Sequence, residues 1–168
     1  MSRVIAAAVI AAAVLGGCGG GDDGPDVQTQ DSYIAQADDV CAKLAQRFQD
    51  AGETDPQTPE EIAQSADVLV ELYGDLLGGL QDVRLPAAAA PRRGAAAFVA
   101  GVRRTNGLLG DLQSSSQRFV EASQGSDPRE LTIAGNAVRS ALDTFRAEQA
   151  VSDRLGLEYG FNVCGSLN

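Results

Sequence analysis

Apolar side chains recur at steps of three and four residues from residue 31 nearly to the end of the chain. This spacing places them on one stripe of an α-helix, and four such stretches follow one another. No alternating pattern typical of a β-strand has a useful length in residues 31–155. The pattern therefore predicts an all-α fold with four helices, each with one apolar face.

Capping and breaking residues predict the limits of the first two helices. The first helix is expected to begin at Asp31 or Ser32 and to end near residue 52. The second begins at the sequence TPEE, residues 58–61, which combines an N-cap threonine, a proline at the first helical position and a glutamate at the third. Pro86 stops the second helix, because a proline cannot continue it.

The third and fourth helices follow an alanine-rich connection or lead-in at residues 87–90. The third is expected to end near Gly125, and the sequence DPRE, residues 127–130, repeats the start signal for the fourth. The apolar faces that we expect to form the core are Ile34, Ala37, Cys41, Leu44, Ala45 and Phe48; Ile62, Ala66, Leu69, Tyr73, Leu76, Leu80 and Val83; Phe98, Val102, Leu109, Leu112 and Phe119; and Leu131, Ala134, Val138, Ala141, Leu142 and Phe145.

The N-terminal region has a different character. An apolar run of twelve residues, 4–15, follows a single cation, Arg3. The run is long enough for the secretion machinery but too short to span a hydrocarbon core of about 30 Å as a stable helix. It leads into LGGC, residues 15–18, which resembles the lipobox of bacterial lipoproteins. The resemblance implies that residues 1–17 are a cleaved signal peptide and that Cys18 carries diacylglycerol as the mature N-terminus. The alternative is a plain signal peptide with an incidental cysteine.

Residues 19–30, GGGDDGPDVQTQ, hold glycine, proline and aspartate with a single aliphatic side chain. Such a segment buries too little apolar surface to offset the entropy of ordering, so it is expected to be a flexible tether. The predicted organisation is thus a signal peptide over 1–17, the lipidated cysteine and its tether over 18–30, and a helical domain over 31–168.

The chain has three cysteines, Cys18, Cys41 and Cys164, and an odd number in an exported protein leaves one thiol to explain. Acylation of Cys18 accounts for that thiol. The other two would lie in a compartment where disulfides persist, so we predict a Cys41–Cys164 bridge. Two buried, unpaired thiols are the alternative. A catalytic thiol is less favoured, because the chain has no histidine to activate it.

Four helices with short connections predict a single up-down-up-down four-helix bundle. In that order the fourth helix ends where the first begins. The segment after Arg154, LGLEYGFNVCG, is expected to fold back along the bundle and to be tied to the first helix through Cys164. Its glycines suit a turn and close packing.

Composition excludes several kinds of chemistry. The chain has no histidine, and Met1 is its only methionine. Ser-His and Cys-His catalysis, histidine-ligated zinc or copper, and His/Met haem ligation are therefore ruled out, which leaves carboxylate chemistry open. No cofactor is expected. Without Arg3 the chain has 12 basic and 23 acidic residues, a balance that argues against nucleic acid as a partner and against attachment to an anionic membrane through a basic patch.

Two helices carry charge patterns that allow a functional interpretation. Asp67, Glu71 and Asp75 lie four residues apart on one face of the second helix, where a site for a cation such as calcium is one interpretation and a solvated face is the one we favour. The third helix is rich in arginine. A site for an anionic ligand or lipid headgroups is one interpretation there, and pairing with the acidic second helix, or simple solubility, is the one we favour.

The sequences YIAQADDVCA at residues 33–42 and LGLEYGFNVCG at residues 155–165 are the most distinctive in the domain. With the lipobox and the tether, they resemble a group of small lipoproteins of actinobacteria. The resemblance covers the layout of the whole chain, although only these two short stretches are distinctive. It implies a location in the cell envelope and the paired cysteines, and it implies no activity.

We therefore expect a lipid-anchored, non-enzymatic binding module of the cell envelope, held to the membrane through diacylglycerol on Cys18, with an envelope protein or ligand as its partner. The alternative is a carrier of a small molecule, lipid or cation between the second and third helices, which are rich in glycine. We expect those glycines to serve close helix packing instead. A hydrolase with paired carboxylates is a third interpretation, and no pair of specific spacing supports it.

Overall fold

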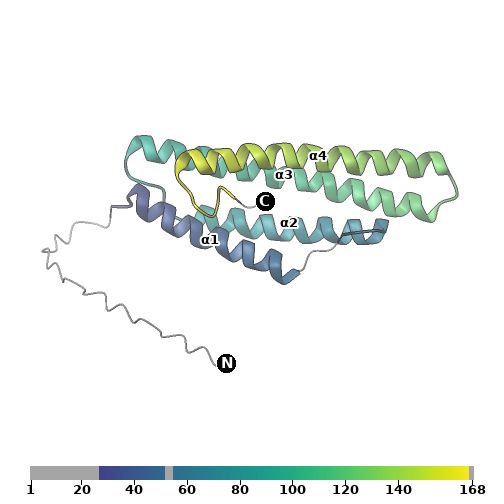
Figure 1. Cartoon of the computed structure of the whole chain (residues 1–168). Coiled ribbons are helices and arrows are strands. Elements are labelled where there is room, and N and C mark those ends of the chain that lie inside the picture. The colour runs from purple at the N-terminus through teal and green to yellow at the C-terminus, as the bar shows by residue number, and fades with distance from the viewer. Residues whose placement is uncertain (1–26, 52–54, 167–168) are drawn as a thin grey trace, which may run out of the picture.

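The computed structural model describes residues 27–51 and 55–166, which form four α-helices and no β-strand (Figure 1). The helices are α1, Gln30–Ala51; α2, Pro59–Asp82; α3, Ala89–Gln124; and α4, Pro128–Tyr159. The prediction of an all-helical bundle is confirmed. The expected signal peptide, Cys18 and most of the expected tether lie outside the described residues.

The start of α2 has the capping box that its sequence predicts. Thr58 Oγ1 accepts a hydrogen bond from the backbone N–H of Glu61 at 3.2 Å. In return, Glu61 Oε2 accepts from the backbone N–H groups of Gln57 at 2.7 Å and Thr58 at 3.1 Å. These hydrogen bonds, with that from Gln57 foremost, lower the pKa of Glu61. Local sequence thus fixes where α2 begins.

The start of α4 follows the same logic with an aspartate. Asp127 Oδ1 accepts from the backbone N–H of Arg129 at 2.8 Å, and Pro128 occupies the first turn. The third helix begins differently, because Ala88 at its N-cap offers no side-chain hydrogen bond. Helix α3 starts at Ala89, inside the segment expected to be a connection or lead-in.

The end of α4 differs from the prediction. The helix was expected to end near Arg154, but it continues to Tyr159. Gly160 ends it with φ of 105°, and its backbone N–H donates to the carbonyls of Gly156 and Leu157, both at 3.1 Å. Gly156 lies inside the helix, and a methyl group there would lie 3.1 Å from the Cα of Gly165. It permits close packing and does not break the helix.

The core consists of the apolar stripes of the four helices together with the C-terminal segment, residues 160–166. Most of the expected core positions on α2 and α3 are buried, and Leu80 and Leu109 are almost entirely inaccessible. The buried residues that were not among the expected ones include Leu72, Ala95 and Thr105. Burial of this apolar surface is the main stabilising contribution to the fold.

One expected core residue is exposed. Leu131, in the first turn of α4, is 37% accessible, and its neighbour Ile133 is 63% accessible. The reason is length, because α3 has 36 residues and α4 has 32, whereas α2 has 24 and α1 has 22. The hairpin of α3 and α4 therefore extends past the other two helices at the end that holds Leu131 (Figure 1).

Glycines allow close approach at three places between elements. A methyl group on Gly79 would lie 2.7 Å from a methyl of Val40, and one on Gly94 would lie 2.6 Å from the ring of Tyr159. A methyl group on Gly101 would lie 2.9 Å from the hydroxyl oxygen of Ser152. Close packing was the favoured explanation for these residues. It does not hold for Gly74, Gly78, Gly107 and Gly110, because added methyl groups there would meet open space.

Helix α3 packs against both α2 and α4, and α1 packs against α2. The C-terminal segment lies beside α1, where Asn162, Val163 and Cys164 donate backbone hydrogen bonds to Asp38. None of the helices in the described residues is both long enough and apolar enough to cross a membrane.

Candidate functional site

The two cysteines of the helical domain lie together in the core. The Sγ atoms of Cys41, on α1, and Cys164, in the C-terminal segment, are 2.03 Å apart, at disulfide distance, and the two residues are 123 positions apart in the chain. Both side chains are fully buried. The structure therefore brings together the two cysteines that the sequence paired. The third, Cys18, lies outside the described residues.

Asp38 forms a second contact between the same two segments. Its Oδ2 accepts from the backbone N–H of Asn162 at 2.9 Å, and its Oδ1 accepts from those of Val163 and Cys164, both at 3.0 Å. Three successive amides thus converge on one carboxylate, as in an anion-binding nest. Asp38 was not among the candidate site residues predicted from the sequence. Its position one helical turn before Cys41 is the signal that could have singled it out.

Four aromatic rings pack where α1, α3, α4 and the C-terminal segment meet. Phe161 lies at the centre, with ring centroids 4.7 Å from Phe98, 4.9 Å from Tyr159 and 6.0 Å from Tyr33. The rings of Tyr33 and Tyr159 meet edge to face at 5.9 Å. Such pairs add stability beyond their buried area, so the cluster supports the return of the chain onto α1.

Burial affects the chemistry of these tyrosines. Tyr33 is fully buried, and its hydroxyl makes no hydrogen bond within the described part of the chain. Burial, and then the proximity of Tyr159, raise the pKa of Tyr33 to about 12. Burial also raises the pKa of Tyr159. Both hydroxyls therefore stay protonated at neutral pH, which suits packing and does not suit a general base.

A buried polar cluster of Thr105, Ser152 and Asp153 lies between α3 and α4. Thr105 Oγ1 donates to the carbonyl of Gly101 at 3.2 Å and lies 3.1 Å from Ser152 Oγ. Asp153 is only 8% accessible. Burial, and then the charge of Asp153, raise the pKa of the nearby Tyr73. The cavity beside this cluster, also lined by α2, measures about 10 Å³, which is room for about one water molecule.

The three acidic residues proposed as cation ligands contact different partners. Arg47, on α1, donates to Glu71 at 2.8 Å and also to Asp75. Asp67 instead accepts from the amide of Gln113, on α3, at 2.7 Å. In the described ranges, no group of three or more His, Cys, Asp or Glu side chains is placed to hold a metal ion. Glu71 and Asp75 are thus together, around a guanidinium, and Asp67 lies apart from them.

The arginines of α3 do not pair as the sequence suggested. We favoured pairing with the acidic residues of α2, or simple solubility, as the role of these arginines. Arg104 instead pairs with Glu148, on α4, with Nε and Oε1 2.7 Å apart. Arg92 donates through Nε to the carbonyl of Pro86 at 3.1 Å, in the connection that precedes its own helix.

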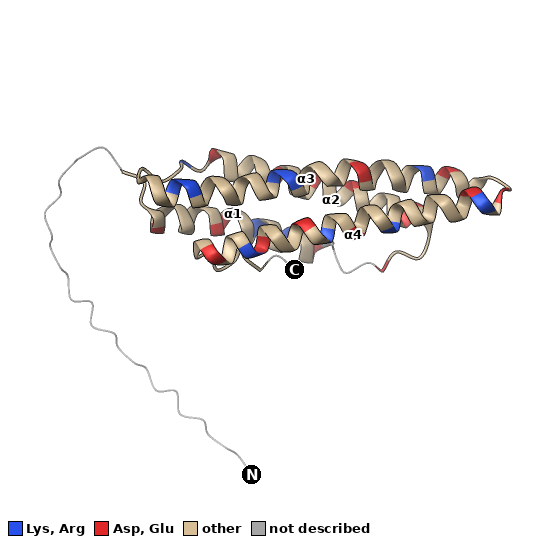
Figure 2. Ribbon diagram, turned by 90° about the horizontal axis from the view of Figure 1, so that it is seen from above, with Lys and Arg blue, Asp and Glu red and all other residues tan. Residues whose placement is uncertain are grey.

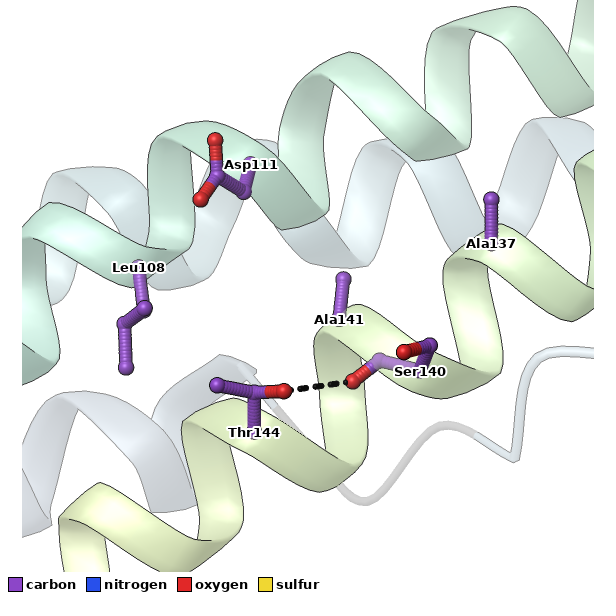
Figure 3. Close-up of a pocket in the computed structure, with 6 residues that line it drawn as sticks. All are labelled: Leu108, Asp111, Ala137, Ser140, Ala141 and Thr144. Carbon is purple, nitrogen blue, oxygen red and sulfur yellow. Dashed lines mark hydrogen bonds between the residues drawn. The ribbon is translucent and has the colours of Figure 1, made fainter.

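A shallow groove lies on the outside of the hairpin formed by α3 and α4 (Figure 3). Its volume is about 300 Å³, at the lower end of the range for small-molecule pockets. Asp111 is its charged group, and Thr144 Oγ1 donates to the backbone carbonyl of Ser140 at 2.8 Å. The lining residues are Leu108, Asp111, Ala137, Ser140, Ala141 and Thr144.

Comparison with known proteins does not extend these observations. No family model matches the chain, and no curated protein and no solved structure is significantly similar to it.

Proposed function

We propose that this protein is a lipoprotein of the cell envelope, attached to the membrane by diacylglycerol on Cys18, whose helical domain binds a protein or another envelope component without catalysing a reaction. One observation carries the proposal: Cys41 and Cys164 lie at disulfide distance in the buried core. Such bridges persist in exported proteins and are rare in the cytosol. This supports export, and the sequence before Cys18 resembles the signal that directs export with lipid attachment.

The proposal includes the topology. The four helices run up-down-up-down, and residues 160–166 fold back onto α1. The hydrogen bond from Gln30 Nε2 to the carbonyl of Tyr159, 3.1 Å long, supports this order, because it places the start of α1 beside the end of α4. The three backbone hydrogen bonds to Asp38 support the return of the C-terminal segment.

A binding role agrees with the chemistry of the described side chains. The tyrosines with raised pKa values are packed in the core, and the 300 Å³ groove has Asp111 as its charged group. Acid–base catalysis needs two groups placed within hydrogen-bond reach of one reacting atom. The groove supplies hydroxyls and one carboxylate, and the chain supplies no histidine to activate them.

The experiment is a comparison of the wild type with Cys18→Ser in the native host. For the wild type we expect a membrane-associated protein with the mass of a diacylated chain that starts at residue 18, and crosslinking in intact cells should recover a reproducible partner. Cys18→Ser should lose both the mass of the diacylglycerol and the cleavage before residue 18, because both depend on the cysteine. A diacylated chain that survives the substitution would contradict attachment at Cys18. Recovery of the protein alone after crosslinking would contradict the binding role.

A small-molecule, lipid or cation carrier is the second candidate, and the groove between α3 and α4 favours it. The ligand was expected between the second and third helices, but the cavity that α2 helps to line measures only about 10 Å³. The groove is therefore the better location. Thermal unfolding with extracted lipids or with calcium tests this candidate, and a shift that Ala141→Trp abolishes would favour it over a protein-binding role.

A further inference from the structure

Asp153, on α4, is the one buried charged residue in the part of the chain that the structure describes. The other charged residues of the described ranges are spread along all four helices (Figure 2), and each is half-buried or exposed. Removal of a carboxylate from water costs free energy unless hydrogen-bond donors replace the water molecules that it loses. The surroundings of Asp153 therefore have to supply donors to its oxygens.

Asp153 borders the cavity of about 10 Å³ in the core, together with Ser152 and Thr105. All three side chains are more than nine-tenths buried, with accessible fractions of 8%, 5% and 1%. The rest of the wall is mostly apolar and includes Val102, on α3, and Cys164 of the bridge. A cavity of this size admits one water molecule and is too small for a larger ligand.

The hydroxyl hydrogens of Thr105 and Ser152 are already used. A hydroxyl has one hydrogen to donate. Thr105 Oγ1 donates its hydrogen to the carbonyl of Gly101 at 3.2 Å. The contact of 3.1 Å between Thr105 Oγ1 and Ser152 Oγ therefore requires Ser152 to be the donor. Ser152 Oγ then has no hydrogen for Asp153, its neighbour in sequence, and keeps its lone pairs as acceptors.

The cavity is thus bordered by acceptors on two sides, the Ser152 hydroxyl oxygen and the Asp153 carboxylate. An ionised carboxylate only accepts, and its two oxygens offer about four sites, so Asp153 can accept a further hydrogen bond beside the interactions that it already makes. Its negative charge contributes, after burial, to the raised pKa of Tyr73. A ligand that fits here has two donors and the size of one water molecule.

We propose that this cavity is a binding site for one water molecule, which donates one hydrogen bond to the Asp153 carboxylate and the other to Ser152 Oγ. The water connects the buried charge with the hydrogen bonds that run through Ser152 and Thr105 to the backbone of α3. It thereby links α4 to α3 in the core and offsets the cost of burying Asp153. Calcium and magnesium take six or more oxygen ligands, and most of this wall is apolar. The site lies within the helical domain and does not depend on lipid attachment or on a binding partner.

The test counts long-lived internal water molecules through the ¹⁷O relaxation dispersion of the solvent, which follows whole water molecules rather than exchanging hydroxyl protons. The protein is the chain from residue 18 onward with Cys18→Ser, which keeps all of the described residues. V102I adds a methylene group at the wall of the cavity. V99I makes the same change at a half-buried position of the same helix that does not line the cavity. We expect V102I to lose one long-lived water molecule relative to the unsubstituted chain, and V99I to lose none.

Equal water counts with and without V102I, in a variant that is folded by circular dichroism, would overturn the proposal, and so would an equal loss in both variants. If V102I does not fold, a high-resolution crystal structure of the unsubstituted chain decides. It should show a density peak within hydrogen-bond distance of both Ser152 Oγ and an Asp153 carboxylate oxygen, and the lack of such a peak would overturn the site. A midpoint of thermal unfolding that rises with sodium chloride but not with choline chloride at equal ionic strength, a rise that Asp153→Asn abolishes, would assign the cavity to a cation and overturn the water assignment.

Discussion

Asp38 accepts a hydrogen bond from the backbone N–H of Cys164 at 3.0 Å. Asp38 lies one helical turn before Cys41, and the Sγ atoms of Cys41 and Cys164 are 2.03 Å apart. The two contacts join the same two segments in different ways. The bridge acts mainly by restricting the unfolded chain, whereas the carboxylate acts only in the folded state. The contributions of the bridge and of Asp38 to stability can therefore be measured separately.

Replacement of Asp38 should loosen the C-terminal segment. Asp38→Ala removes the acceptor of three backbone N–H groups, so we expect the free energy of unfolding to fall by about 1 to 3 kcal/mol. Asp39→Ala is the matched control, because Asp39 is the exposed neighbour in the same helix. It should change stability by less than about 0.5 kcal/mol. Equal urea midpoints for both variants and the wild type would show that the contact contributes nothing.

Loss of the bridge should have a larger effect. The two cysteines are 123 positions apart, and the chain-entropy relation gives about 5 kcal/mol for a loop of this length. We expect the double variant Cys41→Ala, Cys164→Ala to lose up to that amount in urea unfolding. In the unreduced protein, alkylation should reach neither cysteine until a reductant is added. Alkylation of both without reduction would contradict the bridge.

Two glycines of α3 should respond in opposite directions to the same substitution. Gly94→Ala would place a methyl group 2.6 Å from the buried ring of Tyr159, so it should destabilise the protein by about 1 to 3 kcal/mol. Gly107→Ala meets open space on an exposed surface and should stabilise by up to about 1 kcal/mol through helix propensity. Thermal unfolding of the two variants checks this, and a gain for Gly94→Ala would contradict the packing at this position.

Alkaline pH should destabilise the protein through Tyr33. Its pKa is raised from 10.0 in the unfolded chain to about 12 in the fold, because burial disfavours the phenolate. The associated stability is complete below pH 10 and is lost as the pH rises from about 10 to about 12, by roughly 2 to 3 kcal/mol. The midpoints of urea unfolding, measured across this pH range, give the loss of stability.

Tyr33→Phe provides the control for this effect. The Tyr33 hydroxyl makes no hydrogen bond to any described residue, so its removal should change stability little at pH 7. The variant should also show a smaller alkaline loss than the wild type. The loss will not vanish, because burial, and then the charge of Asp153, raise the pKa of Tyr73 as well. Identical alkaline profiles for Tyr33→Phe and the wild type would contradict the assignment to Tyr33.

The helices could be predicted from sequence because local chemistry fixes their limits. The capping box of Thr58 and Glu61 and the N-cap at Asp127 satisfy backbone groups within a few residues of themselves. The end of α4 could not be predicted in the same way. The sequence predicted Gly156 in a turn, but it lies inside the helix, where the absence of a side chain lets the distant Gly165 pack against it.

The contacts between elements were less predictable than the elements. The pairing of Cys41 with Cys164 followed from counting cysteines, but the partners of charged groups did not follow from net charge. Arg104 meets Glu148 on α4 rather than an acidic residue of α2, because helix rotation within the bundle decides which faces meet. Asp38 acquires its role only when the C-terminal segment returns to α1, and no local pattern encodes that return.

The position of the bridge also determines what a protease can release. Any single cut of the backbone between Cys41 and Cys164 leaves two fragments joined through sulfur, and the fragment that begins before Cys41 includes Cys18. The connection between α1 and α2 and the exposed turn between α3 and α4 both lie inside this interval. A nick at either place would therefore convert the protein into a two-chain form without shedding any part of it. Only a second event, reduction or a cut before Cys41, would set a fragment free.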